Sequence, residues 1–202
     1  MRRFGEYFVI AVGAGLEAPT LREVYDGVGL GERVDDVCAR LGTEERRVGA
    51  SILFQGYTAR VWSPLLGAVA LGLPVPALPA DEIHWATSGF TTAAPLPSAT
   101  GTIAEIALDE HFAPMVSALR SEVAEGLLWG NAASSLVGTL KVIANAGELD
   151  QRTWDTAMDV LADPRLSAAG DFTDTGYRRR SCCLYYRVPN GGLCGDCSLN
   201  RA

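Results

Sequence analysis

Four of the five cysteines in this 202-residue chain lie close together near its C-terminal end, and no other feature constrains the fold as much. Cys182, Cys183, Cys194 and Cys197 form the pattern C-C-x10-C-x2-C. A chain so poor in cysteine does not readily produce this density by chance, so the four thiols are predicted to share one site. Four thiolates suit either zinc or iron-sulfur chemistry. The end of the chain is therefore predicted to hold a metal centre.

The residues alone leave three chemistries open for these cysteines: an iron-sulfur cluster, a structural zinc ion and disulfides. A reducing cytoplasm disfavours disulfides. Neighbouring residues of an extended chain point to opposite faces, so Cys182 and Cys183 do not easily occupy two corners of one zinc tetrahedron. A cluster with two irons relaxes this demand because adjacent cysteines can bind different irons. The pattern favours a 2Fe-2S cluster, and zinc stays the main alternative.

The residues around the cysteines suit an electron carrier. Glycines allow backbone amides to approach sulfur, and such hydrogen bonds raise a cluster's reduction potential. Arginines would stabilise the extra negative charge of the reduced cluster, or would simply keep a surface tail soluble. The glycines are Gly191, Gly192 and Gly195, and the arginines are Arg178, Arg179, Arg180 and Arg187.

The charge distribution argues against nucleic-acid binding. The formal net charge is -7. From Asp171 onward five Arg and three Asp give +2, so residues 1–170 carry -9. A basic segment on an acidic body suits a small anionic ligand or an acidic protein partner better than a nucleic acid.

The chain is expected to be cytoplasmic and to lack a transmembrane segment. Pro74 and Pro76 interrupt the longest apolar candidate, which falls short of the roughly 18 residues needed for a span. The start, Met1-Arg2-Arg3 before an apolar run, superficially resembles a signal peptide, but Glu6 lies between the charges and the run. Residues 7–10 are predicted to form a first buried strand instead.

The body is predicted to be mainly helical. Thr20 caps a short helix through Asp26, and residues 32–41 form a second helix that ends at Gly42. Thr43 is the predicted N-cap of a helix that runs towards Trp62, and Pro64 is predicted to begin a separate helix over 64–71.

The second half combines long helices with short strands. Residues 82–88 and 90–93 are expected to form an irregular hairpin around Gly89, or a pair of edge strands. Helices are predicted over 114–128 and 131–146, interrupted at Trp129-Gly130-Asn131, and over 151–162 with Asp150 as cap. Residues 183–188 are read as a strand, followed by a tight turn and a Cys194–Cys197 knuckle. The predicted fold class is α+β and predominantly helical, with a body over 1–170 and a cluster-binding segment over 171–202.

The segment Arg179-Arg-Ser-Cys-Cys-Leu-Tyr-Tyr-Arg-Val-Pro-Asn-Gly-Gly-Leu-Cys-Gly-Asp-Cys197 resembles the C-terminal cluster motif of the FhuF family of ferric siderophore reductases. Residues 50–55, 62–66 and 127–134 are more loosely similar to the helical body of that family. The resemblance implies that Cys182, Cys183, Cys194 and Cys197 ligate a 2Fe-2S cluster.

The resemblance also implies a function, the one-electron reduction of Fe(III) held by a siderophore, of the hydroxamate type. Fe(II) binds hard anionic oxygens far more weakly than Fe(III), so reduction releases the iron. No bond of the siderophore is cut, so no catalytic acid or base is nominated. Neither GxGxxG nor a P-loop is present, so the electrons are expected from an external ferredoxin or reductase. The alternative is a non-catalytic protein with structural zinc and a partner-binding body.

Other conspicuous residues are assigned less specific roles. His84 and His111, the only histidines, are expected in core or helix-end positions. Cys38 lies on the apolar stripe of a helix and is expected to be a small buried hydrophobe. Trp129-Gly130-Asn131 indicates close packing or a buried hydrogen bond, beneath the cluster.

Overall fold

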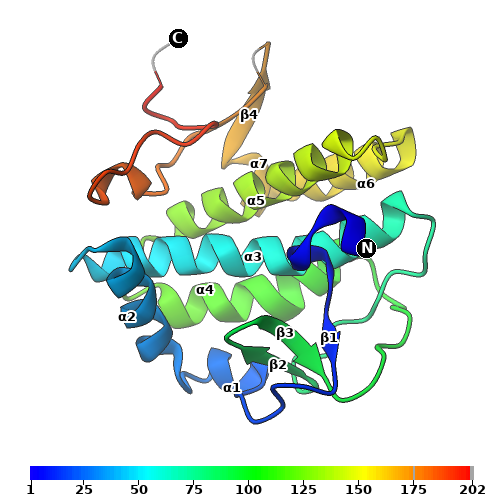
Figure 1. The fold of residues 1–202 in the computed structure, drawn as a ribbon. Coiled ribbons are helices and arrows are strands. Elements are labelled where there is room, and N and C mark those ends of the chain that lie inside the picture. Colours follow the sequence, from blue (N-terminus) through cyan, green and yellow to red (C-terminus); the bar gives the residue numbers. More distant parts are fainter. Residues whose placement is uncertain (175, 201–202) are drawn as a thin grey trace.

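Two long helices that run in the same direction form the centre of the protein (Figure 1). The computed structural model describes residues 1–174 and 176–200. Helices α3 (Arg46–Ala70) and α5 (Glu125–Asn145) lie side by side along most of their length, and most of their side chains are buried (Figure 1). Apolar residues surround α3 nearly completely, as expected for a helix covered on several sides.

Shorter helices cover this pair, and local capping signals define several of their ends. They are α1 (Leu21–Tyr25), α2 (Leu30–Leu41), α4 (Ala113–Leu119), α6 (Gln151–Leu161) and α7 (Pro164–Ser167). Thr20 and Glu23 form a reciprocal capping box before α1. Gly42 ends α2 in the left-handed conformation, and the Asp150 side chain caps α6. These three boundaries confirm the sequence predictions.

Helix α3 differs from the prediction in two ways. Its N-cap is Glu45, and the Thr43 hydroxyl instead accepts a hydrogen bond from the Glu45 amide. The helix also continues through Pro64, so the predicted junction of two helices near Trp62 was wrong. Pro64 forfeits one backbone hydrogen bond. The helix remains continuous because side chains on both sides of Pro64, including Trp62 and Leu65, are fully buried in the same core.

The predicted break at Trp129-Gly130-Asn131 was also wrong, because α5 passes through it without interruption. The break lies earlier, between Leu119 and Glu125. A π-helical stretch, η3 (Glu105–Phe112), precedes α4 and carries His111 into the core. Tertiary burial overrode the local helix-breaking signal of Gly130.

The strands form two small sheets. β2 (Ile83–Ala86) and β3 (Gly89–Thr92) pair antiparallel as the predicted hairpin, and β1 (Ala11–Val12) joins β3 in parallel to give the order β1-β3-β2. β4 (Gly170–Thr173) and β5 (Gly176–Arg179) form the second sheet. The predicted strand over 7–10 was wrong, because 3₁₀ turns η1 (Arg2–Phe4) and η2 (Glu6–Phe8) lead instead into an exposed β1.

The segment after β5 forms no strand at residues 183–188, contrary to the prediction. Leu184 adopts a left-handed conformation, with φ of 69°, and the 3₁₀ turn η4 (Tyr185–Arg187) follows. This reversal of the chain at Leu184 exposes Tyr185 and Tyr186 and prevents strand pairing. The predicted turns are present: Asn190 is also left-handed, and the Cys197 amide donates to the Cys194 carbonyl at 3.1 Å.

The architecture is α+β and predominantly helical, as predicted. One helix of the described residues, α5, is long and apolar enough to cross a membrane by length and composition. In this structure 72% of its most apolar stretch is buried, which is how a core helix is packed.

Candidate metal centre

The cysteine segment lies along α3 and α5, on the side away from the three-stranded sheet (Figure 1). Strand β5 contacts α5 and ends at Arg179, and Ser181 then passes very close to that helix. A Cβ placed on Gly130 would lie 2.1 Å from the Ser181 hydroxyl oxygen. Gly130 therefore makes room for the approach of the cysteine segment, which confirms the close packing that Trp129-Gly130-Asn131 indicated.

The four predicted ligands are free thiols that differ in burial. Cys183 and Cys197 are buried, whereas Cys182 and Cys194 are half-buried. The Sγ atoms of Cys183 and Cys194 are 3.7 Å apart, much farther than a disulfide bond. Backbone amides approach two of the sulfurs: the Leu184 N–H lies 3.3 Å from Cys182 Sγ, and the Leu199 N–H lies 3.4 Å from Cys197 Sγ.

Burial and neighbouring groups raise the pKa values of two of the thiols. Burial raises the pKa of the Cys182 thiol, and the nearby Cys183 and Cys197 raise it further. Burial and the neighbouring Cys183 and Asp196 raise the pKa of Cys194. Four thiolates that bind one centre need a cation to offset their repulsion. Within residues 1–174 and 176–200, no group of three or more Cys, His, Asp or Glu side chains is placed so that it could hold a metal ion.

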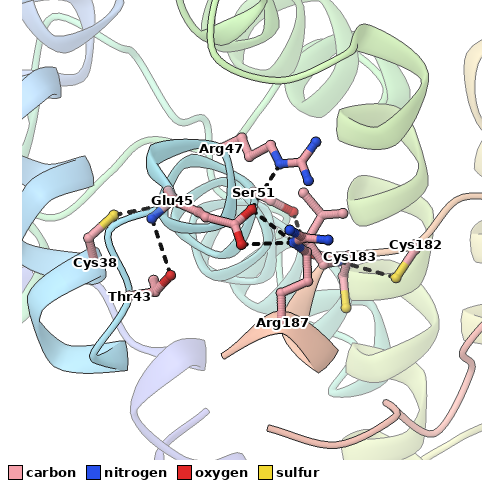
Figure 2. Close-up of polar contacts among 9 residues, drawn as sticks. Cys38, Thr43, Glu45, Arg47, Ser51, Cys182, Cys183 and Arg187 are labelled. Atoms are coloured by element: carbon pink, nitrogen blue, oxygen red, sulfur yellow. Dashed lines mark hydrogen bonds and ion pairs between the residues drawn. The ribbon is translucent and has the colours of Figure 1, made fainter. Parts of the chain in front are cut away.

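A chain of buried hydrogen bonds fastens the cysteine segment to the helical body. The Ser51 hydroxyl donates to the Cys183 carbonyl at 2.7 Å (Figure 2). The Asn131 amide donates to the Ser51 carbonyl and hydroxyl at 2.8 and 2.9 Å, and its own oxygen accepts from the Arg179 guanidinium. One polar network thus connects α3, α5 and the end of β5 with a cysteine. Asn131 makes the buried hydrogen bond that its sequence context predicted.

Two further contacts hold the outer part of the segment. The Ser134 hydroxyl donates to Asp196 at 2.5 Å, next to Cys197 in sequence. Arg187 forms an ion pair with Glu45, the N-cap of α3, at 2.8 Å (Figure 2).

The four arginines of the segment fall into different environments. Arg179 is only 1% exposed, and Nε and Nη1 of its guanidinium have no hydrogen-bond partner within the described residues. Arg180 is exposed and paired with Asp171, and Arg178 donates to the Asn200 carbonyl. That these arginines stabilise a reduced cluster stays a prediction, and Arg180 and Arg187 have carboxylate partners of their own.

The site fits an anionic cluster on the chemistry of its donors. Two ferric ions, two sulfides and four thiolates sum to a charge of -2, and reduction adds a further negative charge. Arg179 provides a buried positive charge with two unused N–H groups close to the cysteines. The unpartnered hydroxyl of Ser181 is a further donor, and the backbone amides of Leu184 and Leu199 donate to the sulfurs of Cys182 and Cys197. A buried charge without a counter-charge is costly, so an anion at this place would stabilise the fold.

A large cavity opens beside the cysteines. Its volume is about 1230 Å³, and Cys183, Cys194 and Asp196 lie in its wall. The opposite walls come from the N-terminal turns, α2, α3, β2 and α5. Its charged lining residues are Arg33, Arg40, Arg60, Lys141, Glu6, Asp36 and Asp196. Aromatic rings support two of these cations: Arg33 lies 4.6 Å from the centroid of Trp85, and Arg60 lies 4.3 Å from that of Tyr7.

The remaining nominated residues lie away from the cysteines. Cys38 is buried against Gly49, as expected of a small hydrophobe. His84 is half-buried and contacts the Ala18 carbonyl at 2.7 Å. His111 is fully buried, and its Nδ1 lies 2.6 Å from the Tyr25 hydroxyl. Sequence reasoning missed Ser51 and Asp196, since a serine in a helix and an aspartate in a tail carry no signal of these contacts.

Fold and site together define a predominantly helical α+β protein with a cysteine-rich C-terminal segment at the edge of a cavity. Residues 179–199 match the family model of the FhuF 2Fe-2S C-terminal domain. This match implies a 2Fe-2S cluster as the cofactor and characterises the chain as an iron-sulfur protein resembling the ferric siderophore reductases. A comparison with curated proteins found no match for the chain. Of the three chemistries that the cysteines left open, the match supports the iron-sulfur cluster.

Proposed function

We propose that this protein is a cytoplasmic ferric siderophore reductase. Cys182, Cys183, Cys194 and Cys197 ligate the 2Fe-2S cluster in the segment 171–202, and the body over 1–170 provides most of the chelate site. When bound, the cluster supplies one electron, which reduces Fe(III) in the siderophore to Fe(II). The siderophore keeps all its bonds and releases the weakly held Fe(II).

The cavity beside Cys183 and Cys194 carries this proposal. Pockets for small ligands measure about 300–1,000 Å³. At about 1230 Å³ the cavity has room for a bulky chelate, and two of the proposed cluster ligands lie in its wall. A chelate bound there lies within electron-transfer reach without any catalytic acid or base. The cavity residues bind and orient the chelate, and the cysteines hold the redox centre beside it.

The charge of the cavity favours a chelate with little net charge. Four basic and three acidic side chains line it, so it is close to neutral in a chain with a net charge of -7. Each hydroxamate group carries one negative charge, so a tris-hydroxamate chelate of Fe(III) is neutral, whereas catecholates carry twice that charge. We therefore expect hydroxamate siderophores as substrates.

The electron comes from an external protein donor, a ferredoxin or a reductase. Exposed apolar side chains lie within a few residues of the half-buried Cys182 and Cys194 in the sequence, and such side chains are common at docking surfaces. They are Tyr185, Tyr186, Leu193 and Leu199.

A single-turnover measurement tests the function. The protein is purified anaerobically, reduced, freed of reductant and mixed with a ferric hydroxamate chelate and a ferrous-specific dye. We expect cluster oxidation and the formation of one Fe(II) per cluster. The redox-inert gallium chelate should bind without oxidising the cluster. A reduced cluster that stays reduced in the presence of several ferric chelates would exclude the proposed activity.

A further inference from the structure

The thiols are arranged as two pairs. The Sγ atoms of Cys183 and Cys194 are 3.7 Å apart. Two sulfurs bound to one tetrahedral metal at about 2.3 Å lie about 3.8 Å from each other, so this separation matches one edge of a metal tetrahedron. Among the four cysteines this is the one sulfur–sulfur hydrogen bond within the described residues.

The other two cysteines share a different environment. Cys182 Sγ and Cys197 Sγ each accept a hydrogen bond from the backbone amide two residues later in the chain, at Leu184 and Leu199. Each iron of a 2Fe-2S cluster with four cysteine ligands takes two thiolates, so a Cys183–Cys194 pair on one iron leaves Cys182 and Cys197 for the other.

The cavity distinguishes the same two pairs. Cys183 and Cys194 lie in its wall, and the lining drawn from the described residues includes neither Cys182 nor Cys197. One pair therefore faces the ligand cavity, and the other pair carries the amide hydrogen bonds.

We infer that Cys183 and Cys194 bind one iron of the cluster, on the side of the cavity, and that Cys182 and Cys197 bind the other. This inference rests on the proposed function for the ligand set and adds how the ligands are shared. Four ligands permit three pairings, and the sequence does not choose among them. The assignment gives the two irons different positions. The Cys183–Cys194 iron lies nearest the chelate, and the Cys182–Cys197 iron lies towards the backbone amides of Leu184 and Leu199.

Mössbauer spectra of oxidised double serine variants test the pairing, because serine oxygen can replace sulfur as a ligand but changes the signal of its iron. We expect Cys183→Ser with Cys194→Ser to alter one iron and leave the signal of the other as in the wild type. Cys182→Ser with Cys197→Ser should alter the signal of the other iron and leave the first as in the wild type. The matched control, Cys182→Ser with Cys183→Ser, should alter both irons. A control that leaves one iron unaltered would overturn the inference.

A measurement on the wild-type protein covers the case in which a double variant loses its cluster. In a reduced 2Fe-2S cluster with one ferrous iron, the opposed spins make the cysteine β-protons on the two irons shift in opposite directions with temperature. We expect Cys183 and Cys194 to show one temperature dependence and Cys182 and Cys197 the other. Any other grouping would refute the pairing. Iron and sulfide analysis of the same sample tests the cluster itself, so the pairing can fail while the proposed function stands.

Discussion

The guanidinium of Arg179 donates a hydrogen bond to the side-chain oxygen of Asn131, and this contact joins the end of β5 to the middle of α5 inside the protein. The Asn131 amide group is already committed as a donor to Ser51, so its oxygen faces the guanidinium. Arg179 is thereby fixed with two unpartnered N–H groups, close enough for its charge to act on Cys182. A buried charge held in this way acts on a neighbouring cluster with little screening.

Arg179→Gln should lower the reduction potential of the cluster by roughly 60 mV, a tenfold change in a one-electron equilibrium. The variant removes a buried cation that favours the more negative, reduced state. The exposed Arg180, paired with Asp171, is the matched control, and Arg180→Gln should shift the potential far less. Redox titrations in low and high salt check this, because screening affects only the exposed charge. Equal shifts in both variants would contradict a special role for Arg179.

Gly130→Ala should destabilise the protein by about 1–3 kcal/mol through overpacking, although alanine is ordinarily the better helix former. The new Cβ would lie 2.1 Å from the Ser181 hydroxyl but 3.5 Å from the Ser181 Cβ, which is an ordinary contact. Ser181→Ala should therefore restore most of the lost stability in the double variant. Urea unfolding of the two single variants and the double variant measures this coupling. Additive effects would mean that the two residues do not meet.

Local signals in the sequence predicted the parts of the fold that depend on short-range chemistry. Thr20, Gly42 and Asp150 mark helix ends because capping hydrogen bonds and left-handed glycine are local requirements. Pro64 and Gly130 misled the prediction for the opposite reason. Both weaken a helix locally, yet here the burial of residues on either side keeps α3 and α5 continuous.

The candidate site was predictable in its ligands but not in its surroundings. The cysteine spacing indicates the metal centre directly, whereas the buried state of Arg179 depends on Asn131 and Gly130, which are about fifty residues away in sequence. The three adjacent arginines look alike in the sequence, and only the packing against α5 separates one from the others. The cavity likewise has walls from elements throughout the chain.

Gly138→Trp should block the transfer of electrons to a ferric siderophore while the cluster spectrum stays unchanged. Gly138 lies in the cavity wall on α5, and a Cβ built there meets no atom within 4 Å, so a large side chain can enter the cavity without disturbing the helix. Gly126, near the start of the same helix, is equally open and is not part of the cavity wall. Gly126→Trp should therefore retain wild-type rates. If both variants reduce the chelate normally in stopped-flow measurements, the chelate binds elsewhere.

The buried His111 in η3 makes the stability of the protein depend on pH. Burial lowers its pKa from 6.5 to about 4, and its Nδ1 and the Tyr57 hydroxyl both lie 2.6 Å from the Tyr25 hydroxyl. The folded state thus holds a neutral imidazole, whereas the unfolded chain takes up a proton near pH 6.5. Stability from this histidine is complete above the unfolded pKa and is lost as pH falls towards the folded pKa.

His111→Gln should therefore make stability less dependent on pH. Between pH 7.5 and pH 5 the protein with His111 should lose about 2 kcal/mol more unfolding free energy than the variant. Both proteins should carry Cys182→Ala, because alanine cannot ligate iron and loss of a cluster in acid then does not enter the comparison. Urea unfolding at the two pH values gives the difference. Parallel losses in the two proteins would show that His111 takes up its proton as readily in the folded state as in the unfolded chain.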